Sequence, residues 1–191
     1  TNLFSLKSGK IDFVPYQYRP VLKLLRSDSN RLLIADEVGV GKTIETGLII
    51  KELQARLDIE SILIICPKPL VSEKKWYEEM KRFDLQFISI DGHTFKHCIS
   101  ETNLEGEWPE NFQKCIIPFS LFDSELLYGS SKKNKHKQYG LINLDPAPKF
   151  DLVVVDEAHN ARNSDTYIHQ AVKYFCDNVS AVLLLTATPV Q

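Results

Sequence analysis

The sequence lacks any apolar run long enough to cross a lipid bilayer. Its longest apolar runs, such as Ile62–Cys66 and Ala181–Leu185, are far shorter than the roughly 20 residues that a membrane-spanning helix needs. The start of the chain, Thr1–Lys10, contains no apolar stretch of the kind found in secretory signals. The sequence therefore predicts a protein that neither spans a membrane nor carries a secretory signal.

The chain also lacks closely spaced cysteines and a strong net charge. Its four cysteines are scattered, with no Cys-x-x-Cys pair, which predicts reduced and mostly structural thiols in an intracellular protein. Its 23 basic and 25 acidic side chains give a formal net charge of −2, so any contact with nucleic acid must come from a local patch. His93 and His97 have the spacing of a helical metal site. However, Asp91–Thr94 reads as a loop and no second ligand cluster follows, so we favour a surface loop there.

The 191 residues, of which 43% are hydrophobic and 25% charged, have the composition of an ordinary globular protein, which excludes disordered and fibrous classes. A chain of this length can form one domain whose core needs no disulfide or metal. Because the first residue is not Met and the last one closely follows a predicted strand, we expect residues 1–191 to be a fragment of a longer protein.

Short, continuously apolar runs alternate with amphipathic stretches along the chain. The predicted strands are Arg31–Ala35, Ser61–Cys66, Phe87–Ile90, Cys115–Pro118, Leu152–Asp156 and Ala181–Leu185. The predicted helices are Tyr16–Arg26, Lys42–Arg56, Ser72–Phe83, Leu121–Tyr128 and Thr166–Asp177. Continuously apolar strands are typical of a parallel sheet covered on both faces. The sequence thus predicts an α/β domain with a mostly parallel central sheet and helices on both faces, whose ligands bind at the carboxyl ends of the strands.

Two polar stretches interrupt this alternation. Ser100–Asn111 reads as a surface loop, and Gly129–Lys149 reads as an exposed, mobile insertion. The insertion carries a basic cluster at Lys132–Lys137. Such a cluster is most often a solvated loop, and the alternative is an attraction to the phosphate backbone of a nucleic acid.

The clearest chemical motif follows the first predicted strand. A complete phosphate-loop pattern begins with glycine, where this chain has Asp36, so only the Gly-x-Gly-Lys-Thr half matches. In that half, the glycines Gly39 and Gly41 on either side of Val40 let backbone N–H groups converge on phosphate oxygens. The start of the following helix adds its partial positive charge.

The last two residues of this motif supply the side chains that bind a nucleotide. Lys42 would reach the β- and γ-phosphates, and the Thr43 hydroxyl would complete the ligand shell of Mg²⁺. The alternative is a strand-to-helix turn whose glycines serve only its conformation. The Lys-Thr pair makes us favour the nucleotide site.

A second motif ends the apolar run that begins at Leu152. Asp156 suits the outer shell of Mg²⁺, and Glu157 suits the base that orients or deprotonates the attacking water. Alone, these carboxylates could be a solvated strand end. Their combination with Lys42 and Thr43 on an earlier strand favours the catalytic interpretation.

A third motif, Leu183–Pro189, is another buried run that ends in hydroxyl side chains. It would bring Thr186 and Thr188 to the same edge of the sheet. Taken by itself it could be a plain turn, but its place roughly 30 residues beyond the acidic pair gives it more weight.

The order Gln17, Gly-Lys-Thr, Asp-Glu-Ala-His and Thr-Ala-Thr resembles the first RecA-like lobe of a superfamily 2 helicase. More narrowly, Ala35–Glu45 resembles the SWI/SNF-type ATPases, and within them the bacterial RNA-polymerase-associated branch. The resemblance implies an ATP- and Mg²⁺-dependent hydrolase that translocates on double-stranded DNA. It also implies RNA polymerase or another DNA-processing complex as a partner, and a cytoplasmic, nucleoid-associated location in a bacterium.

The resemblance also assigns roles to single residues. It makes Gln17 the reader of the adenine edge and His159, Thr186 and Thr188 the residues that couple hydrolysis to movement. It implies a second lobe that closes the cleft and supplies an arginine finger. The segment around Trp76 resembles the next family motif, which lies near the nucleic-acid backbone, although its spacing makes a helix core the favoured interpretation.

Two alternatives stay open at this point. One is a different superfamily 2 motor, such as a restriction-enzyme subunit or an RNA helicase. The other is a nucleotide-gated scaffold that binds nucleic acid without hydrolysis. Lys42, Asp156 and Glu157 argue against the scaffold, because a scaffold has no need of a carboxylate that orients water.

Overall fold

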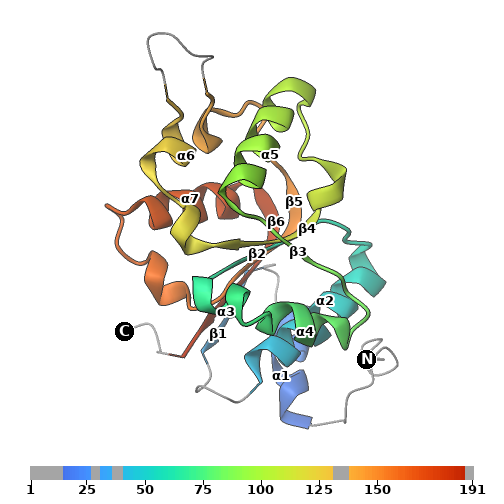
Figure 1. Cartoon of the computed structure of the whole chain (residues 1–191). Coiled ribbons are helices and arrows are strands. Elements are labelled where there is room, and N and C mark those ends of the chain that lie inside the picture. The colour runs from blue at the N-terminus through green and yellow to red at the C-terminus, as the bar shows by residue number, and fades with distance from the viewer. Residues whose placement is uncertain (1–14, 27–30, 36–40, 131–137, 188–191) are drawn as a thin grey trace.

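A computed structural model describes residues 15–26, 31–35, 41–130 and 138–187. In these residues a six-stranded sheet has the order β1-β6-β5-β2-β4-β3, and every neighbouring pair is parallel (Figure 1). The strands are β1 (Arg31–Ala35), β2 (Ile62–Cys66), β3 (Ile88–Ser89), β4 (Lys114–Pro118), β5 (Phe150–Val155) and β6 (Val179–Thr186). The prediction of a mostly parallel α/β domain is confirmed.

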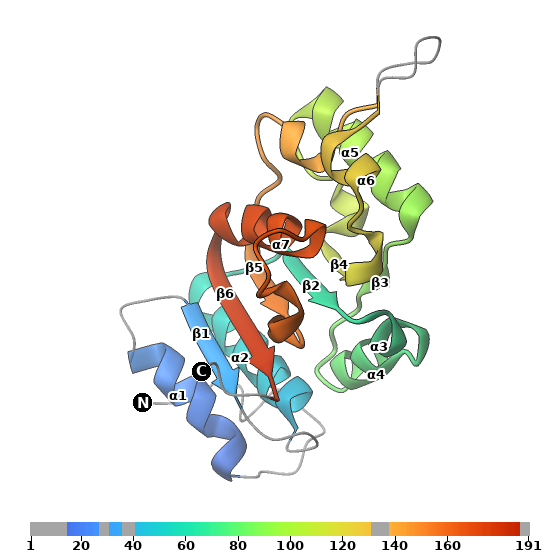
Figure 2. The same ribbon diagram turned by 90° about the vertical axis from the view of Figure 1, so that its left-hand side faces the viewer.

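Helices cover both faces of the sheet (Figure 2). The α-helices are α1 (Arg19–Arg26), α2 (Lys42–Leu57), α3 (Lys68–Ser72), α4 (Lys75–Lys81), α5 (Gly92–Glu105), α6 (Ser124–Tyr128) and α7 (Tyr167–Asp177). One core lies between the sheet and α1, α2 and α4, and a second lies between the sheet and α5, α6 and α7. Short 3₁₀ turns are Pro15–Tyr18, Glu110–Phe112, Phe119–Leu121, Leu141–Asn143 and Ala158–Ala161.

The central strand β2 shows why the apolar runs become strands covered on both sides. Every one of its residues is buried. Ile62 and Ile64 point into the first core, whereas Leu63 and Ile65 point into the second. Because successive side chains of a strand point to opposite faces, a continuous run of isoleucine and leucine serves both cores at once.

The predicted loops at Asp91–Thr94 and Ser100–Asn111 are wrong over most of their length, because α5 spans Gly92–Glu105. The helix begins at Asp91, whose side chain accepts a hydrogen bond from the backbone N–H of Thr94 at 2.8 Å. Phe95, Cys98, Ile99 and Thr102 form its buried stripe at helical spacing. A narrow apolar stripe within a polar segment is easily mistaken for a loop.

The predicted insertion Gly129–Lys149 is also only partly correct. Its basic cluster lies outside the described residues, but Ser130 and Gln138 form an antiparallel bridge at its base. Leu141 and Leu144 are buried in the second core, so the C-terminal half of the segment is packed rather than exposed. The glycines and prolines of this segment predict a loop, but Leu141 and Leu144 fix it to the core.

The remaining expectations concern metals, thiols and membranes. Among the described residues, no group of three or more histidines, cysteines and carboxylates could hold a metal. All four cysteines are free and buried. In the part of the chain that the structure describes, no helix has both the length and the apolar character needed to cross a membrane.

Candidate functional site

Three of the predicted phosphate-binding residues, Gly41, Lys42 and Thr43, are described, and they lie at the start of α2. Lys42 is the first residue of α2 and Thr43 the second. Gly41 precedes them with a φ of 95°, a conformation that a residue with a side chain rarely adopts. Gly39 and Val40 lie outside the described residues, so their predicted contacts with phosphate stay a prediction.

Gln17 lies directly against Gly41, although the two residues are 24 positions apart in the sequence. It sits in the 3₁₀ turn Pro15–Tyr18 and is only 6% exposed. A Cβ atom added at Gly41 would lie 2.8 Å from Gln17 Nε2. The structure therefore places Gln17, predicted to bind adenine, beside Gly41, predicted to bind phosphate. The absence of a side chain at position 41 leaves space for the Gln17 amide.

Asp156 directly follows β5, and its backbone N–H donates to the Ile65 carbonyl of the neighbouring strand at 2.8 Å. Its side chain is buried, with 7% exposed. Burial raises the pKa of Asp156 above its ordinary value, and the Glu157 carboxylate adds to this effect. A hydrogen bond from Trp76, another from the Glu157 N–H and the charge of Lys42 lower the pKa without reversing the shift.

Trp76 is the residue near the site that the sequence interpretation underestimated. The favoured interpretation placed it in a helix core, and it is indeed buried on α4. However, its indole N–H also donates a hydrogen bond to Asp156 Oδ2 at 3.1 Å. Helical spacing identifies an inward-facing tryptophan but does not show what its nitrogen contacts.

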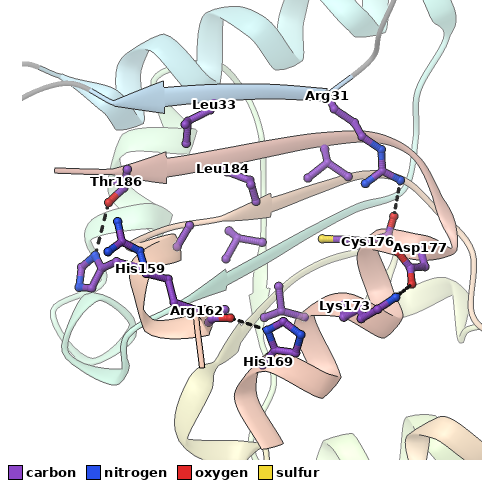
Figure 3. Close-up of a pocket in the computed structure, with 15 residues that line it drawn as sticks. Arg31, Leu33, His159, Arg162, His169, Lys173, Cys176, Asp177, Leu184 and Thr186 are labelled. Atoms are coloured by element: carbon purple, nitrogen blue, oxygen red, sulfur yellow. Dashed lines mark hydrogen bonds and ion pairs between the residues drawn. The ribbon is translucent and has the colours of Figure 1, made fainter. Parts of the chain in front are cut away.

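Glu157, His159 and Thr186 form a second group at the same edge (Figure 3 shows the last two). Glu157 has a φ of 50° and begins the turn Ala158–Ala161, and its Oε2 lies 3.3 Å from His159 Nδ1. Thr186 Oγ1, at the end of β6, lies 3.4 Å from the same nitrogen. The predicted coupling residues are thus in contact, apart from Thr188, which lies outside the described residues.

An apolar cavity of about 320 Å³ lies beside this second group, between α7 and the strands β1 and β6 (Figure 3). Leu33 and Leu184 contribute to its wall, and His159 and Thr186 stand at one end. Neither Lys42 nor Asp156 lines it. The cavity is therefore separate from the residues expected to bind phosphate.

The arrangement fits a magnesium-bound polyphosphate. Lys42 offers a positive charge to the phosphates. Thr43 offers a hydroxyl, and Asp156 and Glu157 offer two carboxylates. Mg²⁺ prefers oxygen ligands of this kind. Burial raises the pKa of Asp156, and repulsion by the nearby Glu157 carboxylate adds to this shift. A divalent cation beside the two carboxylates would relieve that repulsion.

Solved structures of an archaeal ATPase core share this fold. The Sulfolobus solfataricus SWI2/SNF2 ATPase core in complex with dsDNA has a TM-score of 0.65 at 23% identity, with 99% of this chain and 35% of that chain covered. The SWI2/SNF2 ATPase core domain of the same organism has a TM-score of 0.61 at 20% identity, with 100% of this chain and 33% of that chain covered. The fold is therefore the RecA-like fold of a SWI2/SNF2 ATPase core.

Residues 16–191 match the SNF2-related domain, and the chain belongs to that family. The RNA polymerase-associated protein RapA of Vibrio atlanticus is 35% identical over 182 residues, which are 93% of this chain and 17% of that protein. RapA of Cronobacter sakazakii is 32% identical over 190 residues, 97% of this chain and 18% of that protein. The uncharacterized ATP-dependent helicase YqhH of Bacillus subtilis is 31% identical over 182 residues, 93% of this chain and 27% of that protein.

These relatives confirm the predicted resemblance to the RNA-polymerase-associated branch of SWI/SNF-type proteins. The chain spans less than a third of the length of each of them. The family and the fold are therefore shown for this chain, whereas the activity and partners of the whole protein are proposed.

Proposed function

We propose that this chain is the ATP-binding and ATP-hydrolysing lobe of a SWI/SNF-like, DNA-dependent translocase. The observation that carries the proposal is the meeting of three separate motifs at one edge of the sheet. Lys42 and Thr43 begin α2, Asp156 and Glu157 follow β5, and Thr186 ends β6. Family membership supports the same activity, since the shared fold belongs to ATPase cores.

In the proposed mechanism the first strand and helix hold the nucleotide. Gln17 hydrogen-bonds the adenine edge, and its close packing against Gly41 ties the base-binding turn to the phosphate loop. Lys42 donates to the β- and γ-phosphate oxygens with a charge-assisted hydrogen bond. Thr43 and Asp156 are the residues that would hold Mg²⁺, which would supply positive charge beside the phosphates when bound.

The turn after β5 would carry out the hydrolytic step. The Glu157 carboxylate orients the attacking water and takes up its proton. His159 contacts both this carboxylate and the hydroxyl of Thr186. A change in the position of Glu157 on phosphate release therefore reaches the end of β6 through two direct contacts, which is the coupling role proposed for His159 and Thr186.

The partners of the whole protein follow from its relatives. One solved relative is in complex with dsDNA, and others are named RNA polymerase-associated. We therefore propose duplex DNA as the track of the motor, RNA polymerase as a candidate partner, and the bacterial cytoplasm as its location. Residues 1–191 would act as one lobe, with the arginine finger supplied by a second lobe.

Two substitutions separate ATP binding from ATP hydrolysis in the full-length gene product. Lys42→Ala should remove most ATP affinity, because the phosphates lose their charge-assisted donor. Glu157→Gln should keep ATP affinity but lower turnover by about 100-fold or more, because the amide has the shape of the carboxylate without its basicity. Titration with a fluorescent ATP analogue and a steady-state phosphate-release assay measure the two effects.

Wild-type binding and turnover in both variants would show that the active-site assignment is wrong. ATP binding by the wild type with no hydrolysis under any condition would instead favour the non-hydrolysing scaffold.

A further inference from the structure

Trp76 and Asp156 are 80 residues apart in the sequence but in direct contact in the fold. The indole N–H donates to Asp156 Oδ2 at 3.1 Å. Both side chains are buried, with 1% of Trp76 and 7% of Asp156 exposed. A hydrogen bond to a charged acceptor is stronger than one between neutral groups, so this contact restricts the orientation of the carboxylate.

The carboxylate is held from two sides. Asp156 Oδ1 accepts a hydrogen bond from the backbone N–H of Glu157 at 2.9 Å, while Oδ2 accepts the one from Trp76. Each oxygen keeps a further lone pair, which can accept from a metal-bound water or contact the ion itself. The Glu157 donor is part of the turn and moves with Asp156, whereas the Trp76 donor comes from a separate helix.

That helix is firmly seated on the helix that begins with Lys42. A Cβ atom added at Gly47 of α2 would lie 2.2 Å from the ring of Phe83, so this ring, in the turn that follows α4, packs against the bare backbone of α2. Trp76, Met80 and Phe83 belong to the same buried core. The donor of the hydrogen bond is therefore fixed relative to both Lys42 and Asp156.

We propose that Trp76 is a positioning residue, whose indole N–H holds the Asp156 carboxylate in the orientation that its contact with magnesium requires. This inference rests on the proposed function, in which Asp156 helps to hold Mg²⁺. Outer-shell hydrogen bonds of this kind fix the direction of a ligand, and their loss typically costs about 10–100-fold in metal affinity or activity.

The chain contains a matched control for the test. Its only other tryptophan, Trp108, is also buried and also donates its indole N–H, in this case to the Phe112 carbonyl at 3.1 Å. Trp108 packs in the core on the opposite side of the sheet. Trp76→Phe and Trp108→Phe therefore remove the same atoms from two buried sites, and only one of these sites contacts Asp156.

The measurement is the affinity of the full-length gene product for a fluorescent, non-hydrolysable ATP analogue, with Mg²⁺ and with EDTA. Trp76→Phe should weaken the affinity in Mg²⁺ by about tenfold and leave the affinity in EDTA unchanged. Trp108→Phe should change neither value. The melting temperature of each variant tests whether it is folded. If Trp76→Phe does not fold, benzothienylalanine at position 76 replaces the N–H by sulfur in a ring of the same shape.

Wild-type magnesium dependence in the variant at position 76 would overturn the proposal. An equal loss of affinity in Mg²⁺ and in EDTA would also overturn it, because it would show that Trp76 acts through packing. A wild-type protein whose binding does not respond to Mg²⁺ would contradict the proposed function itself, which distinguishes that failure from a failure of this inference.

Discussion

Strand β5 has an aspartate near its start, Asp151, and another directly after its end, Asp156. Their surroundings shift the two pKa values in opposite directions. Asp151, near its start, accepts three hydrogen bonds at Oδ2, from the N–H groups of Glu60 and Ser61 at 2.8 Å and from the Ser61 hydroxyl at 2.9 Å. Partial burial alone would raise the pKa of Asp151, but these hydrogen bonds outweigh it and lower the pKa. Asp156, after the end of the strand, has a raised pKa because burial dominates.

The difference shows what each end of the sheet is built for. At the amino end the protein itself satisfies the charge of Asp151, which ties β5 to the start of β2 and stabilises the fold. At the carboxyl end the charge of Asp156 is only partly compensated, beside a second carboxylate at Glu157. A buried carboxyl group with a raised pKa, at the edge of a parallel sheet where ligands bind, is characteristic of functional sites.

The largest expected effect is on function at the carboxyl end. Asp156→Asn should lower ATP hydrolysis by about 100-fold, because the neutral amide is a poor ligand for magnesium. The same substitution should lower the melting temperature only modestly, because removal of the buried charge offsets the loss of one acceptor for the Trp76 or Glu157 N–H group. Phosphate-release assays and thermal melts of the full-length gene product measure both. A large fall in melting temperature with unchanged hydrolysis would reverse the roles assigned to the two aspartates.

The next effect is on stability at the amino end. Asp151→Ala should cost about 1–3 kcal/mol locally, since it leaves the donors at Glu60 and Ser61 without their acceptor. Hydrogen exchange of the peptide that covers β2 should speed up accordingly, while ATP hydrolysis per folded molecule stays at the wild-type rate. Asp177→Ala, which removes an exposed ion pair with Lys173, serves as the control and should change neither. Slower hydrolysis with unchanged exchange would contradict this assignment.

The smallest effect is a pH dependence of stability with a defined sign. Since folding lowers the pKa of Asp151, its contribution is fully present above the unfolded value of about 3.9 and is lost as the pH falls through the lower folded value. The difference in melting temperature between the wild type and Asp151→Ala should therefore be constant near neutral pH and shrink in acid. A difference that grows in acid would show that the folded pKa is raised instead.

Much of the fold could be predicted from the sequence, because continuous apolar runs identify strands buried on both faces. β1 matches its predicted range, and the other strands differ from theirs only at the ends. The predicted helix Ser72–Phe83 begins later and ends earlier, as α4 (Lys75–Lys81), because Lys74 adopts a φ of 54° and separates it from α3, which ends at Ser72. The miss at α5 has a different cause, since only a few of its residues are apolar and the helix depends on tertiary burial of that stripe.

The site was predictable where short motifs carry the chemistry. The contact of His159 with Thr186 follows from parallel strands ending at one edge, as the motif order indicates. The hydrogen bond of Trp76 to Asp156 and the packing of Gln17 against Gly41 could not be predicted in this way. Both depend on how a helix or turn is seated on the sheet, which the pattern along a single segment does not encode.

We have proposed that the carboxyl edge of this sheet hydrolyses ATP in response to duplex DNA. The most direct test is the steady-state ATPase rate of the full-length gene product with no nucleic acid, with duplex DNA, with single-stranded DNA and with RNA. We expect a low basal rate and a strong increase with duplex DNA. Stimulation by RNA or single-stranded DNA alone, or no response to any nucleic acid, would contradict it.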